Sequence, residues 1–320
     1  MSLVSVIIPV YDRLEYIGEA IESVLVQTHE DYEIIVVDDG STVDVSSVLT
    51  PYMNKIKFVT QSHTGLSAAR NTGIENSSGE FLAFLDDDDL FEPRKLEVQL
   101  VILENNPDIG FVYSDCHEFD SREKREPWLN PAVGREQSRN EFSKLFFMNP
   151  NIRIPTVLIR RKCFEDVGLF DESLDQHEDG DMLLRIALRW QVRFSDYPSA
   201  RVRHHGDRMS LNRVGMYEAI IKSSKKILET APDFKRDLQG YSDKRMAALY
   251  YVLGLSYLQN QMVTEAREAF VCCTQFRHPI KCKAYFYILL FSLGNTLGTR
   301  FAGKIELIKK VFDKSRSRIS

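Results

Sequence analysis

The chain has 320 residues, of which 43% are hydrophobic, and a formal net charge of −5 at pH 7. A chain of this size buries one large core or two smaller ones, and we expect two units. The net negative charge disfavours a general nucleic-acid-binding protein, because such proteins gain affinity by neutralising phosphates.

The first third of the chain alternates strand and helix patterns at short intervals. Residues 4–10 form the first predicted strand, so the amino terminus is expected to be structured and not a signal peptide. Asp12 and Glu15 resemble a capping box that opens a helix with an apolar stripe over residues 14–25. Further strands are predicted at 32–37, 57–60, 81–85 and 109–113, and further helices at 65–76 and from Pro93 onward. This βαβ repetition predicts a mostly parallel sheet with helices on both faces, whose strand-end loops share one edge.

Four consecutive aspartates, Asp86 to Asp89, follow the apolar strand predicted at 81–85. A short acidic run is usually a solvated surface, but here a strand buried on both faces precedes it. In open α/β sheets the carboxyl ends of the strands bind ligands. Crowded carboxylates repel one another unless a cation holds them, and oxygen ligands suit Mg²⁺ or Mn²⁺. The motifs PVYDR and DDGST follow the first two strands, so three unusual loops are predicted at one edge.

The pattern changes in the second half of the chain. Residues 115–140 are polar and are expected to form a loop or an irregular insertion, after which TVLIRR predicts a strand. CFEDVGLF predicts a short helix, and GDMLLRIALRW predicts an amphipathic helix. Beyond about Leu211 only helical periodicity remains. The sequence therefore predicts an α/β domain over 1–211 and an all-α region over 212–320.

Long co-linear blocks of the first domain resemble the family 2 glycosyltransferases of the GT-A fold. The blocks are VSVIIPVYDR, VVDDGST, GLSAARNTGI, FLAFLDDDD and QHEDGDMLLRIA, and they extend over about residues 3–210. The resemblance implies a Rossmann-like GT-A fold and a Mn²⁺ or Mg²⁺ cofactor. It also implies inverting transfer of a sugar from a nucleotide-diphosphate sugar, with UDP as the expected nucleotide. The expected acceptor is a saccharide or a lipid-linked molecule in polysaccharide or glycoconjugate synthesis.

The resemblance assigns nucleotide binding to four residues of these blocks. Asp39 would hydrogen-bond the base, beside a wall formed by Pro9 and Tyr11. Such a carboxylate suits the ring N–H of uracil or thymine, and the aromatic ring offers a stacking face. Arg70 would lie over the nucleotide, where a guanidinium suits base carbonyls and diphosphate oxygens. The family commonly has GSTD where this chain has GSTVD, a difference that affects only a local cap. The alternatives without a functional role are that Tyr11 is an ordinary tyrosine at a strand end and Arg70 a surface arginine on a helix.

The resemblance also divides the roles of the aspartate run. Asp86 or Asp87 would contact the ribose, and Asp88 would bind the metal that bridges the two phosphates. A metal there neutralises the charge that develops on the leaving nucleoside diphosphate. Asp89 is expected to cap the turn into the next helix. Of the histidine pair in RVRHHGD, only one can face the metal on an extended segment, and we expect His205.

The catalytic base is assigned to Asp179, which follows Glu178 in QHEDGD. In the family this aspartate deprotonates the acceptor hydroxyl, which is a poor nucleophile at neutral pH, and Glu178 is expected to support it. A positioned carboxylate contributes roughly 10²–10⁴-fold to such a step. The alternative, from composition alone, is that Asp179 and Asp181 only cap a helix.

The carboxy-terminal region resembles one tetratricopeptide repeat in YYVLGLSYLQNQMVTEAREAF. A single repeat cannot bury its own faces, so we expect a helical appendage that packs on the catalytic domain or against a partner protein. From Arg300 to Ser320 there are seven basic and two acidic residues. Together with the aromatic and aliphatic helix before them, they fit a helix at an anionic membrane surface. A helix that completes the small core, followed by a solvated basic tail, fits equally well.

The expected compartment follows from the cysteines and the apolar segments. Five scattered cysteines without a C-x-x-C pair disfavour a disulfide framework or a zinc site and favour a reducing environment. The apolar run at 285–291 is too short to span a bilayer. We therefore expect a cytoplasmic protein, peripheral at the inner face of the cell membrane if the tail binds lipid.

Two rival functions belong to other classes of protein. A nucleotidyltransferase would carry a Gly-rich phosphate loop near the first strand, and PVYDR contains no glycine. A non-catalytic module that binds a nucleotide sugar or a protein would not need the combination of Asp39, Asp88 and Asp179. The sequence favours the glycosyltransferase.

Overall fold

The computed structural model describes residues 2–119, 124–128, 138–204 and 212–296. The chain forms two compact units, residues 1–237 and residues 238–320. His205 lies outside the described residues, so its predicted place at the metal stays a prediction.

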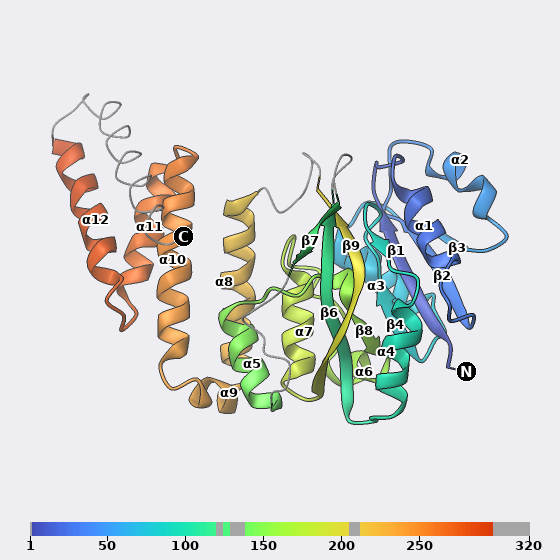
Figure 1. Cartoon of the computed structure of the whole chain (residues 1–320). Helices are drawn as coiled ribbons and strands as arrows, with labels where there is room; N and C mark the ends of the chain where they lie inside the picture. Colours follow the sequence, from blue (N-terminus) through green and yellow to red (C-terminus); the bar gives the residue numbers. More distant parts are fainter. Residues whose placement is uncertain (1, 120–123, 129–137, 205–211, 297–320) are drawn as a thin grey trace. The chain divides into compact units, whose positions relative to one another are not determined.

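The first unit contains a sheet of nine strands within the described residues, flanked by helices (Figure 1). Its strands are β1 (Val4–Val10), β2 (Tyr32–Asp38), β3 (Lys57–Thr60), β4 (Phe81–Phe84), β5 (Leu90–Phe91), β6 (Ile109–Phe119), β7 (Lys124–Trp128), β8 (Leu158–Arg160) and β9 (Gln191–Arg203). Its α-helices are α1 (Ile17–Leu25), α2 (Val45–Leu49), α3 (Leu66–Glu75), α4 (Lys95–Glu104), α5 (Arg139–Met148), α6 (Lys162–Val167), α7 (Glu178–Ala187), α8 (Arg213–Thr230) and α9 (Pro232–Asp237). Helices α8 and α9 thus belong to the first compact unit, beyond the predicted end of the α/β domain at 211.

The strand order is β3-β2-β1-β4-β8-β6-β9-β5, with β7 paired to β6. Strands β3, β2, β1 and β4 are parallel, as the βαβ pattern predicts. Strand β8 is antiparallel to both of its neighbours, while β6 and β9 are parallel to each other. The sheet is therefore mixed, and its parallel part directs the loops after β1, β2, β3 and β4 to one edge.

The core fills both faces of the parallel strands. On one face, the alternate residues Val4, Val6 and Ile8 pack with α1, α2 and α4 in a single apolar cluster. On the other face, Ile7 is fully buried beneath α3, where a Cβ on Gly73 would lie 2.3 Å from its Cγ2 atom. Helix α3 can approach the sheet this closely only because Gly73 has no side chain. This close packing fixes the position of α3, which carries Arg70.

Strand β9 has no counterpart among the predicted strands. It is 13 residues long and contains Pro198, and its pairing with β6 shifts register between Ser114 and Cys116. Most of its residues are at least partly exposed, and four are charged, so it lacks the apolar alternation of a half-buried strand. The short strands β5 and β7 were likewise not predicted.

Two predicted caps are wrong. Helix α1 begins after Tyr16, and no side chain caps it. Asp12 instead has a positive φ of 52°, and its carboxylate accepts hydrogen bonds from the backbone N–H and hydroxyl of Thr42. It therefore ties the PVYDR loop to the DDGST loop. Asp89 accepts from the backbone N–H of Arg203 at 2.8 Å, while helix α4 has no side-chain cap.

The second unit is helical over its described residues, with α10 (Tyr241–Gln259), α11 (Val263–Thr274) and α12 (Lys281–Thr296). Helices α10 and α11 pack closely, since a Cβ on Gly254 would lie 2.8 Å from the Phe270 ring. The Phe270 ring also stacks on Tyr287 of α12, with centroids 4.7 Å apart. The tetratricopeptide-like character of this unit stays a prediction. Among the described helices, none is long and apolar enough to cross a bilayer.

Candidate active site

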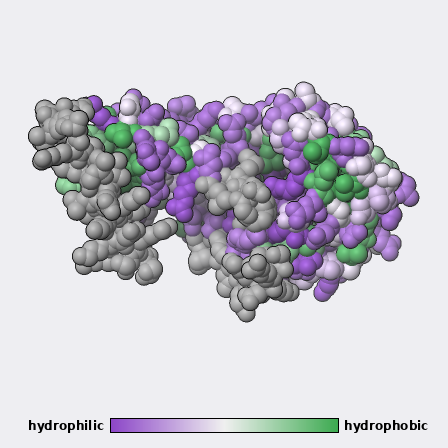
Figure 2. Space-filling model, turned by 90° about the horizontal axis from the view of Figure 1, so that it is seen from above, coloured by the Kyte–Doolittle hydropathy of each residue, from purple (hydrophilic) through white to green (hydrophobic). Residues whose placement is uncertain are grey.

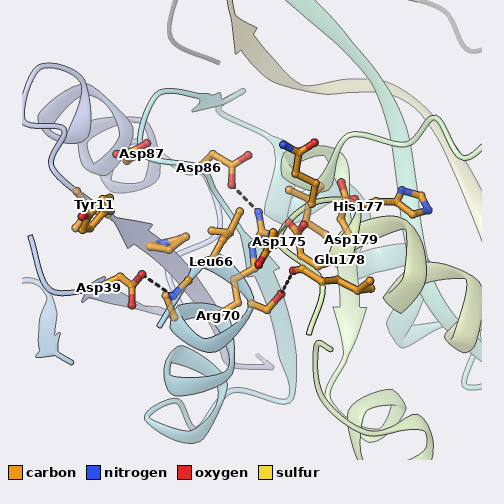
Figure 3. A pocket seen from close by; sticks show the side chains of 18 of the residues that line it. Tyr11, Asp39, Leu66, Arg70, Asp86, Asp87, Asp175, His177, Glu178 and Asp179 are labelled. Atoms are coloured by element: carbon orange, nitrogen blue, oxygen red, sulfur yellow. Dashed lines mark hydrogen bonds and ion pairs between the residues drawn. The ribbon is translucent and has the colours of Figure 1, made fainter. Parts of the chain in front are cut away.

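A cavity of about 570 Å³ opens at the carboxyl edge of the parallel strands. Figure 2, which looks onto the side of Figure 1 where these strands end, shows a largely hydrophilic surface. Nine of the predicted site residues line this cavity: Pro9, Tyr11, Asp39, Arg70, Asp86, Asp87, Asp88, Glu178 and Asp179. Residues far apart in the sequence are thus brought together by the loops after β1, β2 and β4, by α3 and by the start of α7 (Figure 3).

Asp39 directly follows β2, and it is almost fully buried. Its Oδ1 atom accepts hydrogen bonds from Gln61 Nε2 at 2.7 Å and from the Thr64 backbone N–H at 3.0 Å. Its Oδ2 atom accepts from the Gly65 backbone N–H at 2.9 Å and lies 2.8 Å from His63 Nδ1. The loop after β3 therefore fixes the orientation of this carboxylate.

Tyr11 lines the cavity beside Asp39 and stacks on an aromatic neighbour. Its ring lies against the ring of His63, with centroids 4.0 Å apart and planes inclined by 18°. Both side chains are partly exposed to the cavity. The two rings and the Asp39 carboxylate thus form one continuous surface.

Arg13 holds two carboxylates of the aspartate run. Its Nη1 atom lies 2.9 Å from Asp87 Oδ1 and 2.6 Å from Asp88 Oδ2. Burial raises the pKa of Asp87 to about 8, and although Arg13 opposes this rise, the neighbouring charges of Asp88 and Asp86 add to it. Arg13 therefore does not fully offset the burial of Asp87 and the repulsion from its neighbours, and a cation bound beside these carboxylates would lower this pKa.

Arg70 connects the aspartate run to the start of α7. Its guanidinium is 1% exposed and donates to Asp86 Oδ1 at 2.8 Å and, through its other terminal nitrogen, to Glu178 (Figure 3). The ring of Phe170 lies 5.5 Å away on one face. Burial opposes the charge on Arg70, but Asp86 and Glu178 outweigh burial and raise its pKa. Arg70 is therefore a buried permanent cation, and not the surface arginine that was the plain alternative.

Asp179 and Glu178 form the first turn of α7. The preceding residue, His177, has a left-handed backbone with φ of 62°, which is uncommon for a non-glycine residue. The Asp179 carboxylate accepts from the Gly180 backbone N–H at 2.6 Å. Burial raises the pKa of Asp179, while Arg70 and the Gly180 N–H oppose the rise. A carboxylate whose pKa is shifted toward neutrality is suited to accept a proton.

Asp181, the other acid named as a possible helix cap, is buried and makes structural contacts. It accepts from Arg185 Nε at 2.7 Å and from Ser223 Oγ at 3.1 Å, which links α7 to α8. The acids of this turn therefore separate into Asp181, which faces the core, and Asp179, which lines the cavity.

The carboxylates of the cavity could hold a divalent metal only if a bound ligand supplied further oxygen atoms. Within the described residues, no three His, Cys, Asp or Glu side chains are grouped to hold an ion by themselves. Mg²⁺ is commonly bound by one or two carboxylates and the phosphates of a substrate, and Asp87 and Asp88 provide such a pair. His204, the neighbour of the predicted metal ligand, lies with its Nε2 atom 3.1 Å from Glu118 Oε2.

Several lining residues were not singled out from the sequence. They are Arg13, His63, Arg153, Gln176 and His177. Arg13 is the last residue of the PVYDR motif, and a basic residue in a loop predicted to lie beside acidic loops is a signal for an ion pair. His63 follows β3 in a loop without a readable motif, and only the fold brings it to Asp39.

The sequence profile described as "Glycosyl transferase family 2" matches residues 5–168. The chain belongs to this family. An uncharacterized glycosyltransferase of Rickettsia conorii is 38% identical over 206 residues, which are 63% of this chain and 33% of that protein. An uncharacterized glycosyltransferase of Rickettsia typhi is 34% identical over 223 residues, 68% of this chain and 70% of that protein. The chain therefore spans about a third of the length of the first relative and most of the second.

Solved structures of similar fold include two complexes with sugar nucleotides. S. aureus TarS residues 1–349, in complex with UDP-GlcNAc, has a TM-score of 0.65 at 18% identity, over 90% of this chain and 88% of that one. The mannosyltransferase PcManGT from Pyrobaculum calidifontis, in complex with GDP-Man and Mn²⁺, has a TM-score of 0.56 at 17% identity, over 97% and 87% of the two chains. These likenesses confirm the predicted GT-A type of fold.

Proposed function

We propose that this protein is an inverting, metal-dependent glycosyltransferase that uses a nucleotide-diphosphate sugar, with UDP as its nucleotide. One observation carries the proposal: Asp39, the aspartate run and Asp179 line a single cavity at the ligand-binding edge of the sheet. Family membership and the sugar-nucleotide complexes of two proteins with this fold support the same reaction class.

The nucleotide would bind across the carboxyl ends of β1, β2 and β4. Tyr11 offers a face for the base, and the Asp39 carboxylate can accept a hydrogen bond from a base ring N–H. Asp86 or Asp87 would accept hydrogen bonds from the ribose hydroxyls. Arg13, which is partly exposed beside Asp88, carries a charge that suits diphosphate oxygens.

Asp88 would hold the metal, with the diphosphate and Asp87 nearby. When bound, Mn²⁺ or Mg²⁺ neutralises the negative charge that develops on the leaving nucleoside diphosphate. The chain itself contributes the orientation of the carboxylates. Arg13 forms ion pairs with both Asp87 and Asp88 and so holds their carboxylates close together, and Arg70 forms an ion pair with Asp86.

Asp179 would accept the proton of the acceptor hydroxyl. The acceptor oxygen then forms a bond to the anomeric carbon on the face opposite the phosphate, and the bond from that carbon to the phosphate oxygen breaks. The configuration inverts, and the nucleoside diphosphate leaves with the bonding electron pair. Glu178 supports this step through Arg70, since its ion pair fixes the first turn of α7.

The second unit would bring the enzyme to a lipid-linked or saccharide acceptor at an anionic membrane surface. Three large apolar side chains of α12 are exposed, Tyr285, Phe286 and Leu289, and the sequence after α12 is basic. Apolar side chains next to basic residues are the composition of an interfacial anchor. Sedimentation with phosphatidylglycerol vesicles but not with phosphatidylcholine vesicles would support this contact, and F286S/L289S should weaken it. Equal sedimentation with both lipids, or none with either, would contradict it.

Nucleotide binding and turnover test the proposal directly. We expect UDP and UDP-sugars to raise the unfolding temperature of the full chain in the presence of Mn²⁺, and EDTA to remove most of this effect. A ligand that binds only the folded state stabilises it by about 2.7 kcal/mol at a hundredfold excess over its Kd. Absence of stabilisation by any of the common nucleotide sugars would refute the proposal. Binding without release of nucleoside diphosphate in the presence of acceptor extracts would favour the non-catalytic module.

A further inference from the structure

The His63 side chain occupies the position that the proposed function gives to the nucleobase. Its ring lies flat against Tyr11, at a centroid distance of 4.0 Å. Its Nδ1 atom lies 2.8 Å from Asp39 Oδ2. A stacked aromatic ring with a nitrogen at the Asp39 carboxylate is the pair of contacts that would recognise a base.

The hydrogen bonds of Asp39 show that His63 and a base compete. A carboxylate has about four lone-pair sites. Three of the Asp39 partners belong to its loop framework, namely Gln61 Nε2 and the backbone N–H groups of Thr64 and Gly65. Gln61 is held further by Thr72 Oγ1, which donates to Gln61 Oε1. A fourth partner, the Thr64 hydroxyl, lies 3.5 Å from Oδ1, so Oδ1 is occupied by the loop alone. His63 Nδ1 lies 3.2 Å from the Asp39 backbone carbonyl oxygen and 2.8 Å from Oδ2, so a base N–H can approach Oδ2 only if the imidazole leaves.

The stacking geometry gives the same result independently. Two rings with a base between them must be separated by about 7 Å, twice a van der Waals contact of about 3.5 Å. The Tyr11 and His63 rings are only 4.0 Å apart. The His63 ring therefore covers the cavity face of Tyr11 on which the base would stack.

His63 is able to leave without disturbing the core. Its side chain is 53% exposed, so rotation toward solvent opens no buried contact of the sheet. Its backbone is held close to the DDGST loop, because a Cβ on Gly40, which has a φ of +74°, would lie 2.5 Å from the His63 nitrogen atom. The movement is thus expected to be a side-chain rotation about a fixed backbone.

We infer that His63 is an internal ligand of the base subsite, which a nucleobase displaces when the sugar donor binds. This inference rests on the proposed function. In the nucleotide-free protein the imidazole lies against the Asp39 carboxylate and covers Tyr11. A base that enters must replace both contacts, so a ligand that offers a phosphate group but no aromatic ring with an N–H does not displace His63. His63 thereby selects for the base and lowers the affinity for the whole nucleotide.

Calorimetric titration of the full-length protein with UDP and Mn²⁺ tests the inference. We expect His63→Ala to bind UDP about two- to tenfold more tightly than the wild type, the range expected for one stacked aromatic contact. His63→Phe keeps a ring on Tyr11 but loses the contacts of Nδ1 with Asp39, so its affinity should lie between the two. The exposed neighbour Ser62 provides the control, and Ser62→Ala should bind as the wild type does. Pyrophosphate, which lacks a base, should bind equally to the wild type and to His63→Ala.

The outcomes separate the inference from the proposed function. If the wild type binds no nucleotide, the proposed function is wrong. If the wild type binds UDP and His63→Ala binds it equally or more weakly, only the role of His63 is wrong. A second readout needs no variant to stay folded: the Hε1 resonance of His63 should move downfield when saturating UDP removes the ring from Tyr11. A resonance that UDP leaves unchanged overturns the inference.

Discussion

Replacing Arg70 with methionine removes the buried cation shared by two carboxylates. Arg70 is 1% exposed, its Nη2 atom lies 2.8 Å from Asp86, and its Nη1 atom pairs with Glu178, which is itself buried. Breaking a buried ion pair from one side costs about 3–5 kcal/mol, because the remaining charge has no compensation. For a unit of 237 residues, 1 kcal/mol corresponds to about 2–4 °C in Tm. We therefore expect Arg70→Met to lower the Tm of the first unit by about 6–20 °C.

A double-mutant cycle distinguishes this ion pair from simple loss of packing. Glu178→Leu added to Arg70→Met removes the stranded carboxylate, so the double variant should be more stable than Arg70→Met alone. Scanning calorimetry of the full chain would follow the transition of each unit. Arg94 provides the matched control, because it is exposed and pairs with Glu97 at 3.3 Å. Arg94→Met should leave the Tm close to that of the wild type, because exposed ion pairs contribute little to stability. Additive effects of the Arg70 and Glu178 substitutions, with coupling below about 0.5 kcal/mol, would refute the reasoning.

Three further predictions concern buried groups and the metal. Lys95 is fully buried, and its Nζ donates to Gln99 Oε1 at 2.7 Å; burial lowers the pKa of Lys95 well below its usual value. At pH values between this lowered pKa and about 10.4, the usual pKa of lysine, Lys95 is neutral in the folded protein and charged in the unfolded chain, so folding releases a proton. In this pH range the free energy of unfolding should rise by up to about 1.4 kcal/mol per pH unit. Urea titrations of Lys95→Met should lack this rise. In the same titrations Gly73→Ala should lower the free energy of unfolding by about 1–3 kcal/mol, because the new Cβ would overlap Ile7. Gly18→Ala is the control and should not destabilise the protein, because the nearest atom to its new Cβ lies 3.4 Å away. Equal effects of the two substitutions would contradict the close packing of α3. Asp88→Ala should abolish the difference in UDP affinity between Mn²⁺ and EDTA, and a retained difference would remove Asp88 from the metal site.

Sequence patterns predicted the parallel half of the sheet because its strands are continuously apolar and its helices amphipathic. Strand β9 escaped prediction, since its pattern depends on pairing with β6 across a register shift and not on local alternation. Asp12 has the local sequence of a helix cap, but a contact 30 residues away, at Thr42, determines its place.

The predicted site residues came together because family motifs mark the ends of strands. Their partners could not be predicted in the same way. Arg70 was placed near a nucleotide from its motif, but its shared pairing with Asp86 and Glu178 depends on how α3 and α7 face each other. His63 carries no motif, and its contacts with Tyr11 and Asp39 exist only because β1, β2 and β3 are neighbours. The local sequence thus identifies the acidic residues of the cavity, whereas their arginine and aromatic partners become apparent only in the tertiary structure.

The rate of sugar-donor turnover by Asp179→Asn, measured together with UDP affinity, tests the central claim most directly. Asparagine keeps the size of the side chain and removes its capacity to accept a proton at neutral pH. We predict that release of nucleoside diphosphate falls about 10²–10⁴-fold while the Kd for UDP stays within about twofold of the wild type. Turnover at the wild-type rate by a variant that still binds UDP would contradict the assignment of Asp179 as the catalytic base.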